Sequence, residues 1–117
     1  MPRILIVDSD VDAADDLATL VQSQGYGDAR VAYTATTALA LAVEFVPTAL
    51  LVDLDLSDMS GYDLARHLSQ HPQLHNLRLI ALTISTEHPG REQAREAGIE
   101  RYLMKPVGSA ALAELFA

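Results

Sequence analysis

The 117-residue sequence contains no cysteine. This absence excludes disulfide bonds and thiolate chemistry, and it fits a reducing compartment, so we expect a cytoplasmic protein. No apolar run approaches the roughly 20 residues that a membrane-spanning helix needs, and no signal-peptide pattern precedes the strand-like residues 3–7. Low-complexity segments are also absent, and half of the residues are apolar. We therefore expect one domain over residues 1–117.

Basic residues are scarce: eight lysines and arginines stand against 16 aspartates and glutamates, which gives a formal net charge of −8. Because nucleic-acid binding depends on lysine and arginine at the phosphate backbone, this balance argues against a nucleic-acid-binding domain. Aspartates near a helix start interact favourably with the helix dipole, which accounts for Asp12, Asp15 and Asp16, with Asp12 as the helix cap. It does not account for Asp8 and Asp53, which each end an apolar run.

Apolar runs alternate with helical patterns along the chain. We predict strands at residues 3–7, 29–33, 49–52, 77–83 and 101–104, the second of them at a sheet edge because its polarity alternates. Amphipathic spacing predicts three helices, each with one buried face. The residues of these faces are Leu17, Leu20 and Val21 in the first helix; Leu39, Ala42, Val43 and Val46 in the second; and Leu64, Ala65 and Leu68 in the third. A fourth helix, 88–97, offers only alanines as an apolar face, and 109–117 forms the fifth. Gly25 and Gly98 are expected to end the first and fourth helices.

Five strand–helix units predict an α/β fold, a parallel sheet with helices on both faces. In such a sheet, ligands bind at the carboxyl ends of the strands. The residues at these ends are Asp8, Asp53, Thr83 and Lys105. Lys105 is the only lysine in the chain, and its ammonium group can bind a phosphoryl oxygen. The carboxylates supply the hard oxygen ligands that Mg²⁺ prefers, so the four side chains together suit phosphoryl transfer.

Four segments around these residues resemble the receiver domains of two-component response regulators, of the chemotaxis-regulator type: ILIVDSD, LLVDLDLSDMSGYDLA, LIALT and AREAGIERYLMKP. They occur in that family's order, and the intervals between the four strand-end residues match it without gaps. The resemblance implies a flavodoxin-like (βα)5 doubly wound fold with a five-stranded parallel sheet in the order 2-1-3-4-5. It also implies a signalling domain rather than an enzyme, either acting alone or forming the amino-terminal part of a longer regulator.

By this resemblance, Asp53 accepts a phosphoryl group from the phosphohistidine of a sensor histidine kinase or of a phosphotransfer protein. The acceptor becomes an acyl phosphate. Asp8, Asp53 and the backbone carbonyl of Asp55 hold Mg²⁺, and Lys105 binds the phosphoryl oxygens.

The resemblance also implies a conformational switch. Thr83 moves toward the phosphoryl group, and Tyr102 then turns inward, which reshapes the surface formed by the fourth helix, the fifth strand and the fifth helix. An output domain or a partner protein binds that surface, and a homodimer through it is a further possibility. Neither a membrane nor a nucleic acid is an expected partner. The family often has a cis peptide bond at the position that Pro106 makes available here.

The predicted metal site departs from the family pattern. Family members usually carry two adjacent acids after the first strand, whereas this chain has Asp8 followed by Ser9. A hydroxyl is a weaker and neutral ligand, so we expect weakened Mg²⁺ binding, which Asp10 offsets in part if it acts through a water. Asp55, beside the site, is expected to alter the lifetime of the phosphoryl group.

Two alternatives stay open on the sequence. Ile84 stands where a small residue is usual, and its bulk is expected to narrow access to Asp53; together with Ser9 it leaves open a degenerate receiver that binds partners without phosphorylation. The segment DLDLS is also similar to the nucleophile motif of haloacid dehalogenase-type phosphatases, with Asp53 as nucleophile and Asp55 as acid. That motif normally follows the first strand, whereas here it follows the third, and nothing acidic follows Thr83 directly.

Overall fold

Five parallel strands form one sheet in the computed structural model, which describes residues 2–84 and 91–116. They are β1 (Arg3–Val7), β2 (Asp28–Ala32), β3 (Ala49–Asp53), β4 (Arg78–Thr83) and β5 (Ile99–Met104). Their order in the sheet is β2-β1-β3-β4-β5, and each neighbouring pair is parallel. The predicted fold class and strand order are therefore confirmed.

The bounds of β2, β3 and β4 differ from the prediction by one residue, and β5 begins two residues earlier than predicted. β2 lies one residue earlier than 29–33, so Tyr33 falls beyond its end, and the strand occupies the sheet edge as predicted. β5 begins at Ile99 rather than at residue 101, because Ile99 already pairs with Leu79 of β4. An irregularity in the register follows this pair. The charged residues Glu100 and Arg101 interrupt the apolar pattern, so the apolar pattern does not indicate the first part of the strand.

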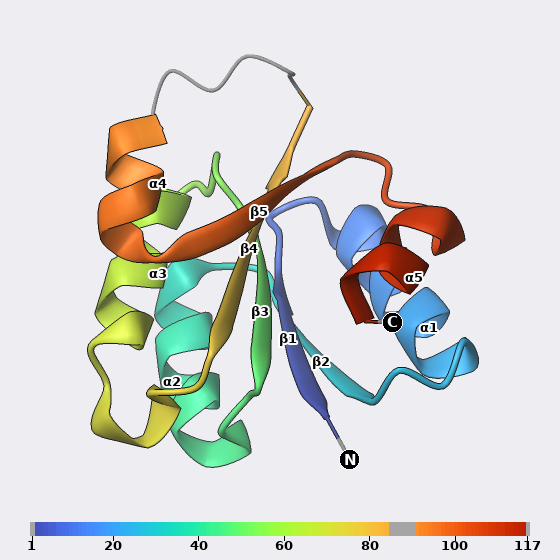
Figure 1. The fold of residues 1–117 in the computed structure, drawn as a ribbon, viewed down its shortest axis with the longest axis horizontal. Coiled ribbons are helices and arrows are strands. Elements are labelled where there is room, and N and C mark those ends of the chain that lie inside the picture. Colours follow the sequence, from blue (N-terminus) through green and yellow to red (C-terminus); the bar gives the residue numbers. More distant parts are fainter. Residues whose placement is uncertain (1, 85–90, 117) are drawn as a thin grey trace.

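Helices cover both faces of the sheet (Figure 1): α2, α3 and α4 lie on its left and α1 and α5 on its right. Their bounds are α1 (Val11–Ser23), α2 (Ala35–Phe45), α3 (Gly61–Ser69), α4 (Arg91–Ala97) and α5 (Ser109–Phe116), with a short 3-10 helix η1 (Pro72–Leu74) after α3. Residues 88–90 of the predicted fourth helix lie outside the described residues. Across the described part of the chain, every helix is too short or too polar to cross a membrane.

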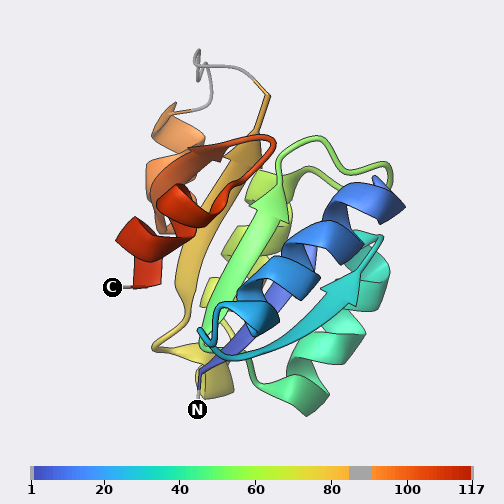
Figure 2. The ribbon, with the colours of Figure 1, turned by 90° about the vertical axis from the view of Figure 1, so that its right-hand side faces the viewer.

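Each face of the sheet carries its own hydrophobic core. In β1, Leu5 and Val7 pack with α2 and α3, whereas Ile4 and Ile6 pack with α1 and α5. Figure 2 looks onto the second face, where α1 and α5 lie on the same side of the sheet with β3 visible between them. All four residues are fully buried, which explains why the central strands are continuously apolar and not alternating.

The start of α1 corrects one prediction. Asp10, not Asp12, is the cap, because the Asp10 carboxylate accepts a hydrogen bond from the Ala13 backbone N–H at 3.2 Å. The Asp10 N–H is itself bound by Asp8, which fixes the residue where the helix begins. Gly25 and Gly98 follow the ends of α1 and α4 with φ values of +78° and +85°, a left-handed conformation that glycine adopts without strain, as predicted.

The buried face of α2 differs from the predicted one in one residue, since Ala42 is buried and Leu39 and Val46 pack against the core as predicted, but Val43 does not. Val43 is 52% exposed, and the buried residues are Ala35, Ala38, Ala42 and Phe45. Their spacing is as helical as that of the predicted set, but three of the four are alanines. Small side chains let the helix approach the sheet closely, so the larger valine is left on the outside.

The loop between β3 and α3 is tied to the start of α2 by Asp58. Its carboxylate accepts hydrogen bonds from the backbone N–H groups of Ala35 at 2.9 Å and Thr36 at 3.0 Å, and from the Thr36 hydroxyl at 2.8 Å. These bonds, the Ala35 bond foremost, lower the pKa of Asp58 below its ordinary value. The loop that follows the candidate site is therefore anchored at a second point.

We expect Asp58→Asn to lower the free energy of unfolding at neutral pH, because an amide oxygen accepts these bonds more weakly and brings no charge to the helix start. The folded-state pKa is lowered, so this stabilisation is complete above the ordinary aspartate pKa of about 4 and is lost as the pH falls below it. Urea unfolding at neutral pH and at about pH 3.5 measures the change in the free energy of unfolding. Asp16→Asn is the control, because Asp16 is an exposed residue of α1. An equal deficit at both pH values would contradict the assignment.

Candidate functional site

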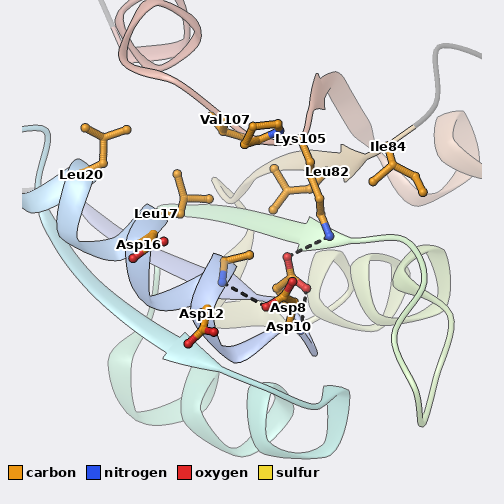
Figure 3. A pocket seen from close by; sticks show the side chains of 12 residues that line it. Asp8, Asp10, Asp12, Asp16, Leu17, Leu20, Leu82, Ile84, Lys105 and Val107 are labelled. Atoms are coloured by element: carbon orange, nitrogen blue, oxygen red, sulfur yellow. Dashed lines mark hydrogen bonds and ion pairs between the residues drawn. The ribbon is translucent and has the colours of Figure 1, made fainter.

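Three of the four predicted strand-end side chains meet directly. The Lys105 ammonium lies 2.9 Å from Asp8 Oδ2 and 3.2 Å from Asp53 Oδ2. Asp8 follows the last residue of β1, Asp53 ends β3, and Lys105 follows the last residue of β5. The order of the strands brings the two carboxylates onto neighbouring strands at the centre of the sheet, and the lysine reaches them from the edge strand β5. Figure 3 shows the Lys105 ammonium group next to Asp8.

Both carboxylates are buried: Asp8 is 2% and Asp53 is 7% exposed. Burial opposes charge on Lys105 as well and acts to lower its pKa, but the hydrogen bond to Asp8 and the charge and hydrogen bond of Asp53 outweigh it. The pKa of Lys105 is therefore raised above its ordinary value. Lys105 is a cation at neutral pH, and it holds two negative groups together that would otherwise repel each other.

The second oxygen of each carboxylate is bound by the backbone. Asp8 Oδ1 accepts the N–H of Asp10 at 2.9 Å, and Asp53 Oδ1 accepts the N–H of Asp55 at 3.1 Å. In both cases the donor lies two residues further on, in the turn that leaves the strand. These bonds fix the orientation of both side chains, so that one oxygen of each faces the lysine.

Thr83 lies at the end of β4, between β3 and β5. Its side chain is half-buried, and its carbonyl accepts the Lys105 backbone N–H at 2.8 Å, which places the lysine backbone next to it. The peptide bond that follows, Lys105–Pro106, is cis, as the resemblance allowed. Ile84 is 75% exposed and lies at the rim of the site, so that its effect on access to Asp53 stays a prediction.

A cavity of about 740 Å³ opens beside Lys105, between α1 and the segment that follows β5. In Figure 3, Leu17 and Leu20 of α1 face Val107 across it, and Asp12 and Asp16 stand along its α1 side. The cavity therefore has apolar walls, an acidic margin on one side, and the ammonium group at its inner end.

The donor set is compatible with a Mg²⁺ ion. Magnesium usually takes one or two carboxylates and keeps several waters, and Asp8 and Asp53 are two fixed carboxylates at one point of the sheet edge. Ser9 is exposed and neutral, and the Asp10 carboxylate is engaged as the α1 cap. Within residues 2–84 and 91–116, no group of three or more His, Cys, Asp or Glu side chains is placed to hold a metal. Protein ligation of an ion would therefore be sparse.

Two contributors to the site surroundings escape sequence analysis. Asp58 anchors the loop through partners 22 and 23 residues away, and no local pattern indicates such a contact. Gly61 begins α3 against the backbone of β3, since a Cβ atom on it would lie 2.4 Å from the Asp53 carbonyl oxygen. A glycine at a helix start, directly after the capping residue Ser60, is the only sequence signal for this approach.

The arrangement suits an anionic group placed at Asp53. The cation of Lys105 contacts the Asp53 carboxylate, the half-buried Thr83 ends the neighbouring strand, and Lys105 and Asp8 line the cavity beside them. Hydrogen bonds to charged oxygens are strong where water is partly excluded. A carboxylate held in this way is an acceptor for an electrophile such as phosphorus, with the product charge neutralised by the lysine.

The comparisons with known proteins agree with this geometry. The model of a family described as the response regulator receiver domain matches residues 4–117. An uncharacterized 14.6 kDa protein of Leptolyngbya boryana is 34% identical over 104 residues, which cover 89% of this chain and 79% of that protein. The response regulator PleD of Caulobacter vibrioides is 30% identical over 105 residues, which cover 90% of this chain but only 23% of PleD.

A solved structure is similar over nearly the whole chain. The crystal structure of a putative response regulator from Chloroflexus aurantiacus superposes with a TM-score of 0.87 at 30% sequence identity. The match covers 98% of this chain and 94% of that one. The parallel sheet and its helices are therefore shared between the two proteins.

We expect Lys105→Met to lower the free energy of unfolding at neutral pH by on the order of 1–3 kcal/mol, because two buried carboxylates lose their cation. The raised pKa of Lys105 means that its contribution is complete below the ordinary lysine pKa of about 10.4 and is lost only above it. Urea unfolding in EDTA measures the loss. In an Asp53→Asn background the loss should be smaller, since one negative charge is gone; an undiminished loss would show that the ion pair is not the cause.

Proposed function

Because the chain belongs to the response regulator receiver domain family of two-component signalling, we propose that it is a phosphorylation-controlled signalling domain with Asp53 as its phosphoacceptor. The observation that carries the proposal is the Lys105 ammonium at 2.9 Å from Asp8 and 3.2 Å from Asp53, beside an open cavity. Lys105 gives this buried carboxylate a cation that can neutralise a charged product, and the cavity that Lys105 lines lies beside it.

In the proposed reaction, a carboxylate oxygen of Asp53 attacks the phosphorus of a phosphohistidine on a kinase or phosphotransfer protein. The bond from phosphorus to the histidine nitrogen breaks, the nitrogen keeps the electron pair, and an acyl phosphate forms on Asp53. Lys105 neutralises the phosphoryl oxygens, and the Thr83 hydroxyl donates to one of them. The Asp55 N–H keeps the acceptor carboxylate oriented during the transfer.

A bound Mg²⁺ would neutralise further negative charge on the transferred group. We propose Asp8, Asp53 and the backbone carbonyl of Asp55 as the residues that hold it. With Ser9 in place of a second acid, we expect this site to bind more weakly than in relatives that carry both acids.

Receiver domains act on partners, and the surface of α4, β5 and α5 is the proposed contact for an output domain or a partner protein, with Thr83 and Tyr102 as the switch residues. We infer that the chain catalyses only its own phosphorylation and dephosphorylation. The share of relatives that it covers, 79% in one case and 23% in another, is consistent with a receiver acting alone or within a longer regulator. A family match over residues 4–117 is inconsistent with the alternative dehalogenase-type phosphatase.

Incubation with Mg²⁺ and acetyl phosphate should add one phosphoryl group per chain, detected by intact-protein mass spectrometry. Asp53→Asn should abolish the addition, because the attacking oxygen is lost, whereas Asp55→Asn should keep it and change only the decay rate. An unmodified wild-type protein would support a degenerate receiver, and sustained turnover of phosphate esters would support an enzyme.

Ser9→Asp should tighten Mg²⁺ binding by about tenfold, or ~1.4 kcal/mol, because it adds a charged oxygen ligand next to Asp8. Isothermal titration calorimetry measures the affinity, and Ser9→Asn, which has a similar size and no charge, is the matched control. Equal affinities of all three proteins would place the ion away from residue 9.

A further inference from the structure

Tyr102 points into the protein in this structure. Its neighbour Leu103 packs with α1 and α5, and because side chains alternate along a strand, Tyr102 lies on the opposite face, toward α3 and α4. Its partner in the register is Ala81 of β4, a fully buried small residue that leaves room for the ring. The Tyr102 ring is half-buried and its hydroxyl oxygen is fully buried.

Tyr62 meets Tyr102 from the first turn of α3. The Tyr62 hydroxyl lies within interaction range of the buried Tyr102 hydroxyl. Burial, this interaction, and the nearby charge of Asp55 raise the pKa of Tyr62 to about 12. Tyr62 is therefore a neutral hydroxyl group at physiological pH.

Tyr62 is also joined to the candidate site through the backbone that precedes it. The preceding residue, Gly61, lies against the Asp53 and Leu54 backbone, and its N–H donates to the Leu54 carbonyl at 3.1 Å. No side chain separates the start of α3 from the end of β3. A displacement of the loop that carries Asp55 is therefore transmitted to Tyr62 by backbone contact.

We infer that Tyr62 is a second switch residue, a positioning group whose hydroxyl holds Tyr102 in its inward orientation and connects it to the loop after Asp53. This inference rests on the proposed function, in which Tyr102 reports phosphorylation of Asp53. The route from the site to β5 then has two branches, one along β4 through Thr83 and one through the start of α3.

The physical consequence is a coupling between Tyr62 and the phosphoryl site. A hydrogen bond made only when Tyr102 is inward favours that orientation, and linkage requires that whatever favours the inward orientation also favours the phosphorylated form. Removal of one hydroxyl should therefore shift Tyr102 outward and weaken the response to phosphorylation, without any loss of groups that touch Asp53.

Tyr62→Phe tests the inference, because it removes the hydroxyl oxygen and keeps the aromatic ring. Nitration with tetranitromethane, followed by peptide mapping, reports the exposure of Tyr102 in the protein without a phosphodonor. We expect Tyr102 to be nitrated several-fold faster in Tyr62→Phe than in the wild type. Tyr33→Phe is the control, since it removes an exposed hydroxyl that bonds to Asp15. An unchanged rate at Tyr102 would overturn the inference.

Beryllofluoride, used with Mg²⁺ as a stable mimic of the phosphoryl group, provides the second measurement. We expect Tyr62→Phe to weaken its binding about threefold, in keeping with the loss of one hydrogen bond, and to have no effect in a Tyr102→Phe background. An equal weakening in both backgrounds would show a purely structural role and overturn the inference. A wild-type protein that does not bind beryllofluoride would refute the proposed function, while the nitration result would still decide whether Tyr62 positions Tyr102.

Discussion

The contact of one ammonium group with two buried carboxylates is the constraint on which the rest of the site depends. Asp8 and Asp53 stand on adjacent strands and carry like charges in a poorly hydrated place, so their arrangement is stable only with the cation of Lys105 between them. The fold meets this requirement by ending three strands of one sheet at the same edge. Each of these residues lies at the end of a different strand, so the site forms only when β1, β3 and β5 are in place in the sheet.

The central part of this arrangement could be predicted from the sequence because continuous runs of apolar residues indicate buried strands. Strands covered on both faces are continuously apolar, and a charged residue at the end of such a run is conspicuous. Asp8, Asp53 and Lys105 were predicted on this ground, and the structure brings them together. β5 was harder, because its exposed residues Glu100 and Arg101 interrupt the apolar pattern at its start.

The errors have a common physical origin. Val43 was placed on the buried face of α2 because periodicity records where apolar residues recur, but not that a row of alanines permits a closer approach than a valine. Sequence composition does not separate Asp10 from Asp12 as the cap, because both aspartates suit the helix dipole. The local bonds from Asp10 N–H to Asp8 and from Ala13 N–H to Asp10 determine where the helix begins. The contributions of Asp58 and Gly61 are not predictable from local sequence, because their partners come from other elements.

The anchored loop after β3 also determines the direction from which Asp53 can be approached. Asp58 binds this loop to the start of α2 through hydrogen bonds, and at the end of the loop Gly61 packs against the backbone of β3. The loop therefore has little freedom to open as a lid. The cavity on the opposite side, between α1 and Val107, is already formed in front of Lys105. A macromolecule that reaches Asp53 from that side would meet apolar walls and the carboxylates of Asp12 and Asp16. Under the proposed function, the charge and shape of the α1 side of this cavity would then contribute to selectivity among phosphodonors, separately from the residues proposed to react.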